Sequence, residues 1–272
     1  MIEAETDQRL AALQELLLEL APVAIAFSGG VDSTFLLKVA HDTLGDRAIA
    51  LTADSPVYPR SEIEEAANLA RRIGARQIVI EVNQLEQHEF AANPPERCYH
   101  CRRVLYGRLL DEAKQQGCRT LVDGANADDA DDYRPGMRAA AEAGVRSPLL
   151  ELGITKEMVR EMSRSLNLPT ADKPSYACLA SRIPYGTEIS KSNLAMVEQA
   201  EEFLHTLGFR QIRVRWHGSV ARIEAPASQI EEICKPVVRT RIVAALEEIG
   251  FRYVALDLRG YRTGSMNEEI GR

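Results

Sequence analysis

The sequence predicts an α/β fold, in which helices cover both faces of a parallel sheet, followed by a smaller α+β domain. Short apolar runs alternate with helical periodicities in the first part of the chain, which is typical of a parallel sheet. The first apolar run enters a helix through a turn with two glycines. Beyond Pro174 the pattern changes to an alternating strand pair between helices. We therefore expect one domain over residues 1–173 and a second over residues 174–272.

In the first domain, helical spacing of leucines predicts a helix that ends before Pro22. Ser61 and Glu64 form a capping-box pattern for a helix that Gly74 ends. A further helix is expected over residues 101–116. The predicted strands cover residues 22–27, 47–53, 77–82, 120–123 and 147–150.

The second domain is predicted to begin with a helix near residues 191–207. A hairpin follows, because two alternating runs are joined at His217-Gly218. The remaining elements are a long helix and a last strand. The expected ranges are 211–216 and 219–224 for the hairpin, 228–249 for the helix and 253–258 for the strand.

The most informative motif is Ser28-Gly29-Gly30-Val31-Asp32-Ser33, between the first strand and its helix. Glycines allow a tight turn, so that backbone N–H groups and the helix N-terminus point together at an anion. Ser28 and Ser33 add hydroxyl donors, and Asp32 could hold a metal ion or orient the loop. A Walker loop is excluded because no Gly-Lys-Ser/Thr follows, and the spacing of a dinucleotide-binding loop is absent.

A second segment of interest follows the strand at residues 120–123. The ligand crevice of such a sheet lies at the carboxyl ends of its strands, so Gly124 opens onto the same crevice as the glycine loop. Asp128 and Asp129 could hold a Mg²⁺ ion beside a bound phosphate. The alternative is a solvated acidic loop without a ligand.

Three of the five cysteines could form one site. Cys98 and Cys101 lie at the start of a helix beside arginines, where a thiolate is favoured. Cys178 lies in the link between the domains. Three thiolates can hold a [4Fe–4S] cluster with one open iron. A zinc site completed by His100, or a redox dithiol beside an unrelated Cys178, would also fit the pattern.

Arginines in the second domain are candidates for binding a phosphate or a carboxylate, because guanidinium pairs with either in bidentate geometry. The candidates are Arg182, Arg213, Arg215 and Arg222, and the first three are assigned to the site. Arg213 and Arg215 alternate on one strand and are expected to face outward. The alternative is an ordinary exposed face.

The composition narrows the class of protein. The chain has 272 residues, and its net charge of −7 argues against a nucleic-acid partner. No stretch has the length needed to span a bilayer, and the acidic N-terminus does not resemble a signal peptide. We therefore expect a cytoplasmic protein without a membrane partner, in which five cysteines are poor evidence for disulfides.

The motif at residues 28–33 resembles the loop of the PP-loop ATP pyrophosphatase superfamily. With the segments at residues 132–136 and 177–187, the whole chain resembles the LarE family. The resemblance implies that ATP adenylates a carboxylate of pyridinium-3,5-biscarboxylic acid mononucleotide, which then becomes a thiocarboxylate for the nickel-pincer nucleotide.

The resemblance also implies two routes for sulfur. Members with one cysteine sacrifice it to dehydroalanine, and the matching residue is Cys178. A second group is thought to use three cysteines with a [4Fe–4S] cluster as sulfide carrier, and Cys98, Cys101 and Cys178 fit that group. A sulfide donor and a homo-oligomer, a hexamer in other members, are further implications.

Other functions remain open at this point. A tRNA thiolase of the same superfamily can combine a Cys-x-x-Cys pair with a third cysteine, although the acidic charge is unfavourable for RNA. An amidating ligase resembling NAD synthetase would leave the cysteines unexplained. A non-enzymatic scaffold that binds a nucleotide or nickel would form no pyrophosphate.

Overall fold

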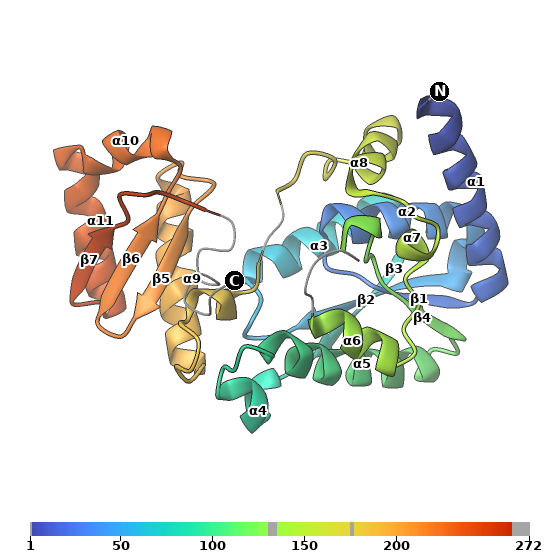
Figure 1. The fold of residues 1–272 in the computed structure, drawn as a ribbon, viewed down its shortest axis with the longest axis horizontal. Helices are drawn as coiled ribbons and strands as arrows, with labels where there is room; N and C mark the ends of the chain where they lie inside the picture. Colours follow the sequence, from blue (N-terminus) through green and yellow to red (C-terminus); the bar gives the residue numbers. More distant parts are fainter. Residues whose placement is uncertain (1, 130–134, 175–176, 263–272) are drawn as a thin grey trace. The chain divides into compact units, whose positions relative to one another are not determined.

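The computed structural model describes residues 2–129, 135–174 and 177–262, which form two compact units (Figure 1). The first unit comprises Met1–Gln84 and Cys98–Tyr176, and the second comprises Leu85–Arg97 and Ala177–Arg272. The chain passes between the units near the predicted boundary at residue 173. The segment Leu85–Arg97, which the sequence assigns to the first domain, instead packs with the second unit.

The first unit is built on a four-stranded parallel sheet in the order β3-β2-β1-β4, which confirms the predicted α/β fold. Its strands are β1 (Val23–Ala26), β2 (Ala48–Asp54), β3 (Arg76–Glu81) and β4 (Thr120–Val122). The prediction of a strand at residues 147–150 is wrong. This segment forms the short helix α7 (Pro148–Glu151), because a proline has no N–H for a strand ladder but is well suited to the first helical turn.

Helices cover both faces of this sheet (Figure 1). Val23 and Ile25 of β1 point into one core with α1, α2, α3 and α8, while Ala24 between them points into the other core with α5 and α6. The helices are α1 (Ile2–Leu20), α2 (Val31–Leu44), α3 (Arg60–Ile73), α5 (Arg97–Gln115), α6 (Pro135–Glu142) and α8 (Lys156–Ser165).

The ends of α3 test the predicted helix signals. Gly74 ends the helix in the left-handed conformation, with φ of 88°, as the sequence predicts. The capping box at Ser61 is wrong, because the helix already begins at Arg60, after Pro59, and no side chain caps it. Pro59 fixes its own φ at the helix entrance, and the helix starts two residues earlier than an N-cap at Ser61 would place it.

The second unit contains a three-stranded sheet in the order β5-β6-β7. β5 (Arg213–His217) and β6 (Val220–Glu224) form the predicted antiparallel hairpin, with Gly218 at a φ of 66° in the turn. β7 (Tyr253–Leu256) pairs parallel with β6. The predicted single helix over residues 228–249 is split into two, because Pro236 cannot continue a helix. The helices are α4 (His88–Ala91), α9 (Lys191–Thr206), α10 (Ile230–Cys234) and α11 (Pro236–Ile249).

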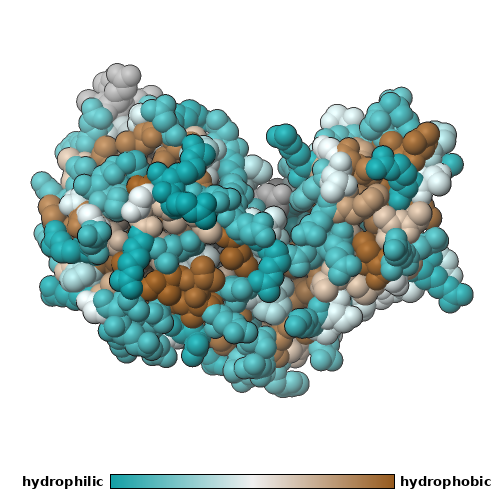
Figure 2. Space-filling model, turned by 180° about the vertical axis from the view of Figure 1, so that it is seen from behind, coloured by the Kyte–Doolittle hydropathy of each residue, from teal (hydrophilic) through white to brown (hydrophobic). Residues whose placement is uncertain are grey.

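One face of the protein is mostly polar (Figure 2). Figure 2 shows hydrophilic residues over most of one face of the protein, with hydrophobic residues gathered in small areas. No helix in the described part of the chain is long and apolar enough to cross a membrane.

Candidate functional site

The loop between β1 and α2 is shaped by its own hydroxyl groups. The Ser33 hydroxyl accepts a hydrogen bond from the Ser28 N–H at 3.3 Å and donates to the Gly30 carbonyl at 3.2 Å. The Ser28 and Ser33 hydroxyls lie 3.2 Å apart, and the Gly30 N–H donates to the Ser28 hydroxyl at 3.4 Å. The serines therefore hold the turn that brings the N-terminus of α2 to the end of β1, where an anion is favoured.

Two glycines are required for this geometry. Gly29 has a φ of 73°, and a Cβ there would lie 3.1 Å from the Cα of Ala66 in α3. A Cβ on Gly124 would lie 2.9 Å from the backbone nitrogen of Ser33. Gly30 differs, because its φ is −75° and a Cβ would meet nothing closer than 3.4 Å. Gly29 and Gly124 thus permit close backbone packing around the loop.

Asp32 in the first turn of α2 is held by two side chains that the sequence analysis did not single out. Lys156 forms a salt bridge with its Oδ2 atom, and Asn126 donates to its Oδ1 atom at 3.3 Å. Lys156 comes from the start of α8 and Asn126 from the segment after β4. A lysine near a helix start carries no distinctive sequence signal, so only the fold reveals this cation beside the loop.

Asp128 and Asp129, the predicted magnesium ligands, both accept hydrogen bonds from backbone N–H groups. Asp128 accepts from the Lys156 backbone N–H, and Asp129 accepts from the Asn126 backbone N–H, both at 3.0 Å. Within each unit, the described residues contain no group of three His, Cys, Asp or Glu side chains placed to hold a metal ion. Asp131, Asp132, Tyr133 and Arg134 lie outside the described residues.

A buried network fixes the carboxyl end of β4. Asp123 is 4% exposed and accepts hydrogen bonds from the Tyr106 hydroxyl at 2.6 Å and the Ser147 hydroxyl at 2.7 Å. Arg102 donates to the same Tyr106 oxygen at 2.6 Å. Burial raises the pKa of Tyr106, so it remains a hydroxyl donor to Asp123. The network holds the residue before Gly124 in place.

Lys173 is a second lysine that contacts the loop. Its ammonium lies 2.8 Å from Glu62 and 2.9 Å from Glu65, both on α3, and donates to the Gly29 carbonyl at 3.3 Å. Burial alone would lower the pKa of Lys173, but hydrogen bonds with the two carboxylates outweigh it and raise the pKa. Lys173 therefore remains charged beside the loop.

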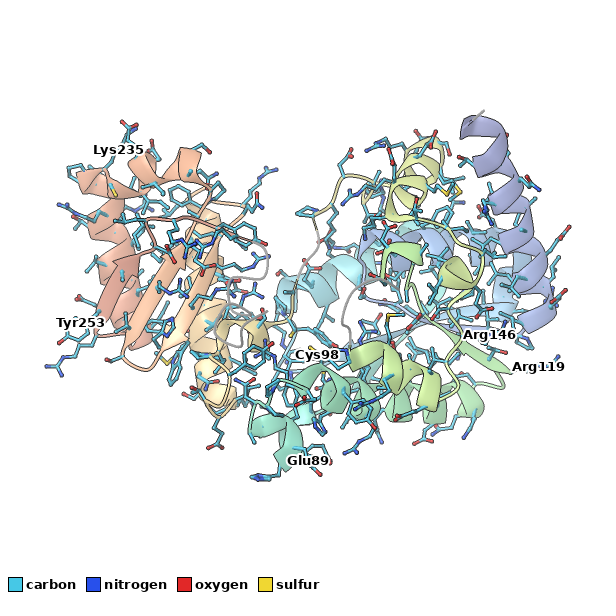
Figure 3. The ribbon with its side chains drawn as sticks, in the orientation of Figure 1. Glu89, Cys98, Arg119, Arg146, Lys235 and Tyr253 are labelled. Atoms are coloured by element: carbon cyan, nitrogen blue, oxygen red, sulfur yellow. The ribbon has the colours of Figure 1, made fainter. Side chains whose placement is uncertain are left out.

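The candidate cysteines are divided between the units. Cys98 and Cys101 lie in the first turns of α5, which begins four residues before the predicted start (Figure 3). Cys178 directly precedes the 3₁₀ turn Leu179–Arg182 in the second unit. Cys98 is exposed and the other two are partly exposed, with no disulfide among the described cysteines. Cys98, Cys101 and His100 do not form a preformed zinc site; the three-cysteine site stays a prediction.

Hydrogen bonds join Asn93, in the segment before Cys98, to residues 183–187, in the segment after Cys178. The Asn93 side-chain amide donates to the carbonyls of Ile183, Pro184 and Thr187, at 3.3, 2.7 and 3.0 Å. Its oxygen accepts from Arg97 at 2.8 Å. All of these residues belong to the second unit. The neighbour of Cys98 in the chain is therefore anchored to the same unit as Cys178.

The candidate arginines are buried, so the expectation that Arg213 and Arg215 face outward is wrong. Arg213 and Arg215 are each 5% exposed and Arg182 is fully buried. Arg182 grips Glu201 with two hydrogen bonds of 2.9 Å and donates to the Cys178 carbonyl at 2.9 Å. Arg215 is 2.7 Å from Glu224. The buried carboxylates Glu201 and Glu224 therefore compensate the charges of Arg182 and Arg215. The spacing of residues along the chain did not reveal these two pairs.

Replacing Glu201 with alanine is expected to lower the free energy of unfolding by about 3–5 kcal/mol, because it leaves the Arg182 guanidinium buried without its carboxylate. Glu201 also accepts from the Val214 backbone N–H at 2.9 Å. Urea unfolding followed by circular dichroism measures the change. Glu231→Ala, an exposed carboxylate in the same unit, is the control and should change stability by less than about 0.5 kcal/mol. Equal effects of the two variants would contradict the structural role of the pair.

Comparison with known proteins agrees with this geometry. Residues 9–129, which include the loop, match the asparagine synthase family. An uncharacterized protein of Synechocystis sp. is 44% identical over 97% of this chain and 98% of its own length. The pyridinium-3,5-bisthiocarboxylic acid mononucleotide synthase of Lactiplantibacillus plantarum is 39% identical over 96% of this chain and 94% of its own. An argininosuccinate synthase of Haloarcula marismortui is 29% identical over only 54% of this chain and 37% of its own length.

The loop, its place at the carboxyl end of a parallel sheet and the matching family define an ATP-using enzyme of the PP-loop class. Within that class, nearly full-length similarity identifies the family: the chain belongs to the LarE family of ATP-dependent sulfurtransferases.

Proposed function

We propose that this enzyme uses ATP to convert a carboxylate of pyridinium-3,5-biscarboxylic acid mononucleotide into a thiocarboxylate. A carboxylate oxygen attacks the α-phosphorus of ATP, which forms an acyl adenylate and releases pyrophosphate. A sulfur nucleophile then attacks the activated carbonyl and AMP leaves. The observation that carries the proposal is the loop at residues 28–33, in a chain similar almost end to end to a synthase of the corresponding bisthiocarboxylic acid mononucleotide.

The chain's own residues account for the adenylation step. The turn held by Ser28 and Ser33 and the N-terminus of α2 favour the negative phosphates. Lys156 adds a positive charge next to Asp32. Gly124 lets the end of β4 approach this turn closely. These groups stabilise the charge that develops on the departing pyrophosphate.

The proposed reaction uses ATP together with Mg²⁺, which is commonly held by substrate phosphates and only one or two carboxylates. All three candidate carboxylates accept hydrogen bonds within the protein, but Asp32 lies in the loop itself and is therefore nearest to the proposed phosphate site. We therefore propose Asp32 as the first magnesium ligand and keep Asp128 and Asp129 as secondary candidates.

We propose that Cys98, Cys101 and Cys178 hold a [4Fe–4S] cluster. Their chemistry fits this group, because all three are thiols outside disulfides and none is fully buried. The hydrogen bonds that anchor Arg97 to the unit of Cys178 also favour the assignment. When bound, such a cluster has an iron without a protein ligand and can supply sulfide. The alternative is that Cys178 alone gives up its sulfur and becomes dehydroalanine.

We propose that Arg182, Arg213 and Arg215 form the site for the substrate's phosphate or carboxylate. Guanidinium groups bind a phosphate or a carboxylate in bidentate geometry, and Arg182 binds the Glu201 carboxylate in this way. Arg182 also donates to the Cys178 carbonyl, which holds the cysteine next to this group.

The proposed reaction is tested by incubating the purified protein anaerobically with ATP, Mg²⁺ and the biscarboxylic acid mononucleotide. We expect pyrophosphate and AMP to form only with the substrate present, together with a product in which sulfur replaces oxygen, detected by mass spectrometry. Pyrophosphate formation with tRNA and not with the mononucleotide would contradict the proposal and favour a tRNA thiolase. No pyrophosphate with any substrate would favour a nucleotide-binding scaffold.

The proposal extends to partners. We propose a homo-oligomer, a hexamer by resemblance, that works in the cytoplasm with a sulfide donor. Light scattering coupled to size-exclusion chromatography measures the oligomeric state directly, and a monomer at micromolar concentration would contradict it.

A further inference from the structure

We propose that Lys173 is a positioning residue that orients the Gly29–Gly30 peptide so that its N–H faces the phosphates of ATP. This inference rests on the proposed adenylation site. Lys173 lies in the first unit, five residues before Cys178 in the sequence, and its ammonium is 3.3 Å from the Gly29 carbonyl oxygen.

The geometry of the peptide supports this role. The Gly29–Gly30 bond is trans, because the cis bond among the described residues is Ala21–Pro22. In a trans peptide the carbonyl and the N–H of one plane point in opposite directions. A carbonyl turned toward Lys173 therefore turns the Gly30 N–H away from it, toward the hydroxyl of Ser28 at 3.4 Å. This N–H is solvent-exposed and only weakly bonded, so a phosphate oxygen can take it up.

One face of α3 holds the lysine and the loop together. Glu62, Glu65 and Ala66 lie one turn apart on this helix. The two carboxylates bind the Lys173 ammonium at 2.8 and 2.9 Å, while Ala66 lies so near Gly29 that a Cβ added to the glycine would be 3.1 Å from it. The hydrogen bond from the Gly30 N–H to the Ser28 hydroxyl is long, at 3.4 Å, and restrains the Gly29–Gly30 peptide only weakly. A glycine at a φ of 73° has no side chain to add to it, so the Lys173 contact supplies a further restraint.

Lys173 is bound tightly enough to act as a fixed donor. Its side chain is 11% exposed, and its pKa is raised by hydrogen bonds with the carboxylates, so it stays protonated at neutral pH. Lys173 also offsets one of the two negative charges of Glu62 and Glu65, which would otherwise repel a nearby phosphate more strongly. Positioning and charge balance are two separate effects, and they can be distinguished by mutation.

The test compares the wild type with Lys173 variants in two measurements. Isothermal titration calorimetry gives the Kd for pyrophosphate, and crystal structures give the orientation of the ligand-free loop. Lys173→Met is expected to raise the Kd for pyrophosphate at least about tenfold, and crystals of the ligand-free variant should show the Gly29–Gly30 peptide flipped or in two orientations. Adding Glu62→Gln and Glu65→Gln to Lys173→Met removes the carboxylate charges that the lost ammonium leaves uncompensated. If Lys173 acts by positioning the peptide, this triple variant should still bind pyrophosphate weakly. Lys38→Met, a lysine on α2 paired with Asp42, is the control and should bind as the wild type does.

Several outcomes would overturn the inference. Unchanged binding by Lys173→Met would remove the residue from the site. Full restoration by the two Glu→Gln changes would assign it to charge balance. Weaker binding with an unaltered peptide would make it a direct phosphate ligand. If the methionine variant does not fold by circular dichroism, Lys173→Gln gives the same comparison. Absence of pyrophosphate binding by the wild type would instead contradict the proposed adenylation site.

Discussion

Replacing Gly29 with valine is expected to abolish ATP-dependent pyrophosphate formation, with a loss of at least about a hundredfold. A residue with a Cβ at a φ of 73° costs roughly 1–2 kcal/mol, and a branched one more. The new side chain would also collide with the backbone of Ala66, 3.1 Å away, so that the loop or α3 must move. Pyrophosphate release, measured with a coupled assay at saturating substrate, records the loss.

Gly30→Ala is the matched control for this variant. Gly30 has a φ of −75°, and a Cβ there meets only the Ser28 hydroxyl, at 3.4 Å. We expect this variant to keep its fold and most of its pyrophosphate formation. Equal losses in the two variants would show that the requirement at Gly29 is not conformational, and full activity of Gly29→Val would exclude the loop from the reaction.

Replacing Cys178 with alanine is expected to abolish thiocarboxylate formation but to leave the pyrophosphate released in the first turnover, because the acyl adenylate then finds no sulfur nucleophile. Both sulfur mechanisms require this thiol, as a cluster ligand or as the donor, whereas the groups that we propose bind the phosphates of ATP lie in the first unit. The product is measured by mass spectrometry after anaerobic reaction. Cys234→Ala, an exposed cysteine of the second unit, is the control and should retain sulfur transfer. Continued thiocarboxylate formation by Cys178→Ala would contradict both mechanisms.

Cys98→Ala and Cys101→Ala distinguish the two mechanisms. If the three cysteines hold a cluster, each change should remove most of the iron and end multiple turnover, because a cluster held by two thiolates is labile. If Cys178 is sacrificed, both variants should complete a single turnover. The sacrificial mechanism also predicts that the intact mass of the wild type falls by one H₂S at Cys178 after reaction. Observation of this loss would overturn the cluster mechanism, even if some iron is bound.

The local sequence accounts for much of the fold. The continuous apolar run of β1 indicated a strand covered on both faces, and its successive side chains do point into two separate cores. Gly74 ended α3 as predicted, since a glycine adopts the left-handed conformation without strain. Local signals were weaker at Pro148 and Pro236, where an apolar run became a short helix and a long helix broke in two.

The candidate site was only partly predictable. The loop at residues 28–33 was recognisable because its chemistry lies in consecutive residues. Lys156 and Lys173 were not, because each reaches the loop from more than a hundred residues away in the sequence and carries no motif that marks its destination. Arg213 and Arg215 were assigned to the correct strand but to the wrong environment, since burial depends on the carboxylates opposite them.

The sequence by itself therefore determined the α/β class, the phosphate-binding turn and the family, because periodicity and contiguous motifs are local properties. Tertiary structure alone decided which of the two loop glycines is sterically required, which lysines face the loop, and that the candidate arginines are buried. The packing of Gly29 on Ala66 and of Arg182 on Glu201 joins residues distant in the chain. Such contacts depend on how helices and strands meet in space, which short-range patterns do not encode.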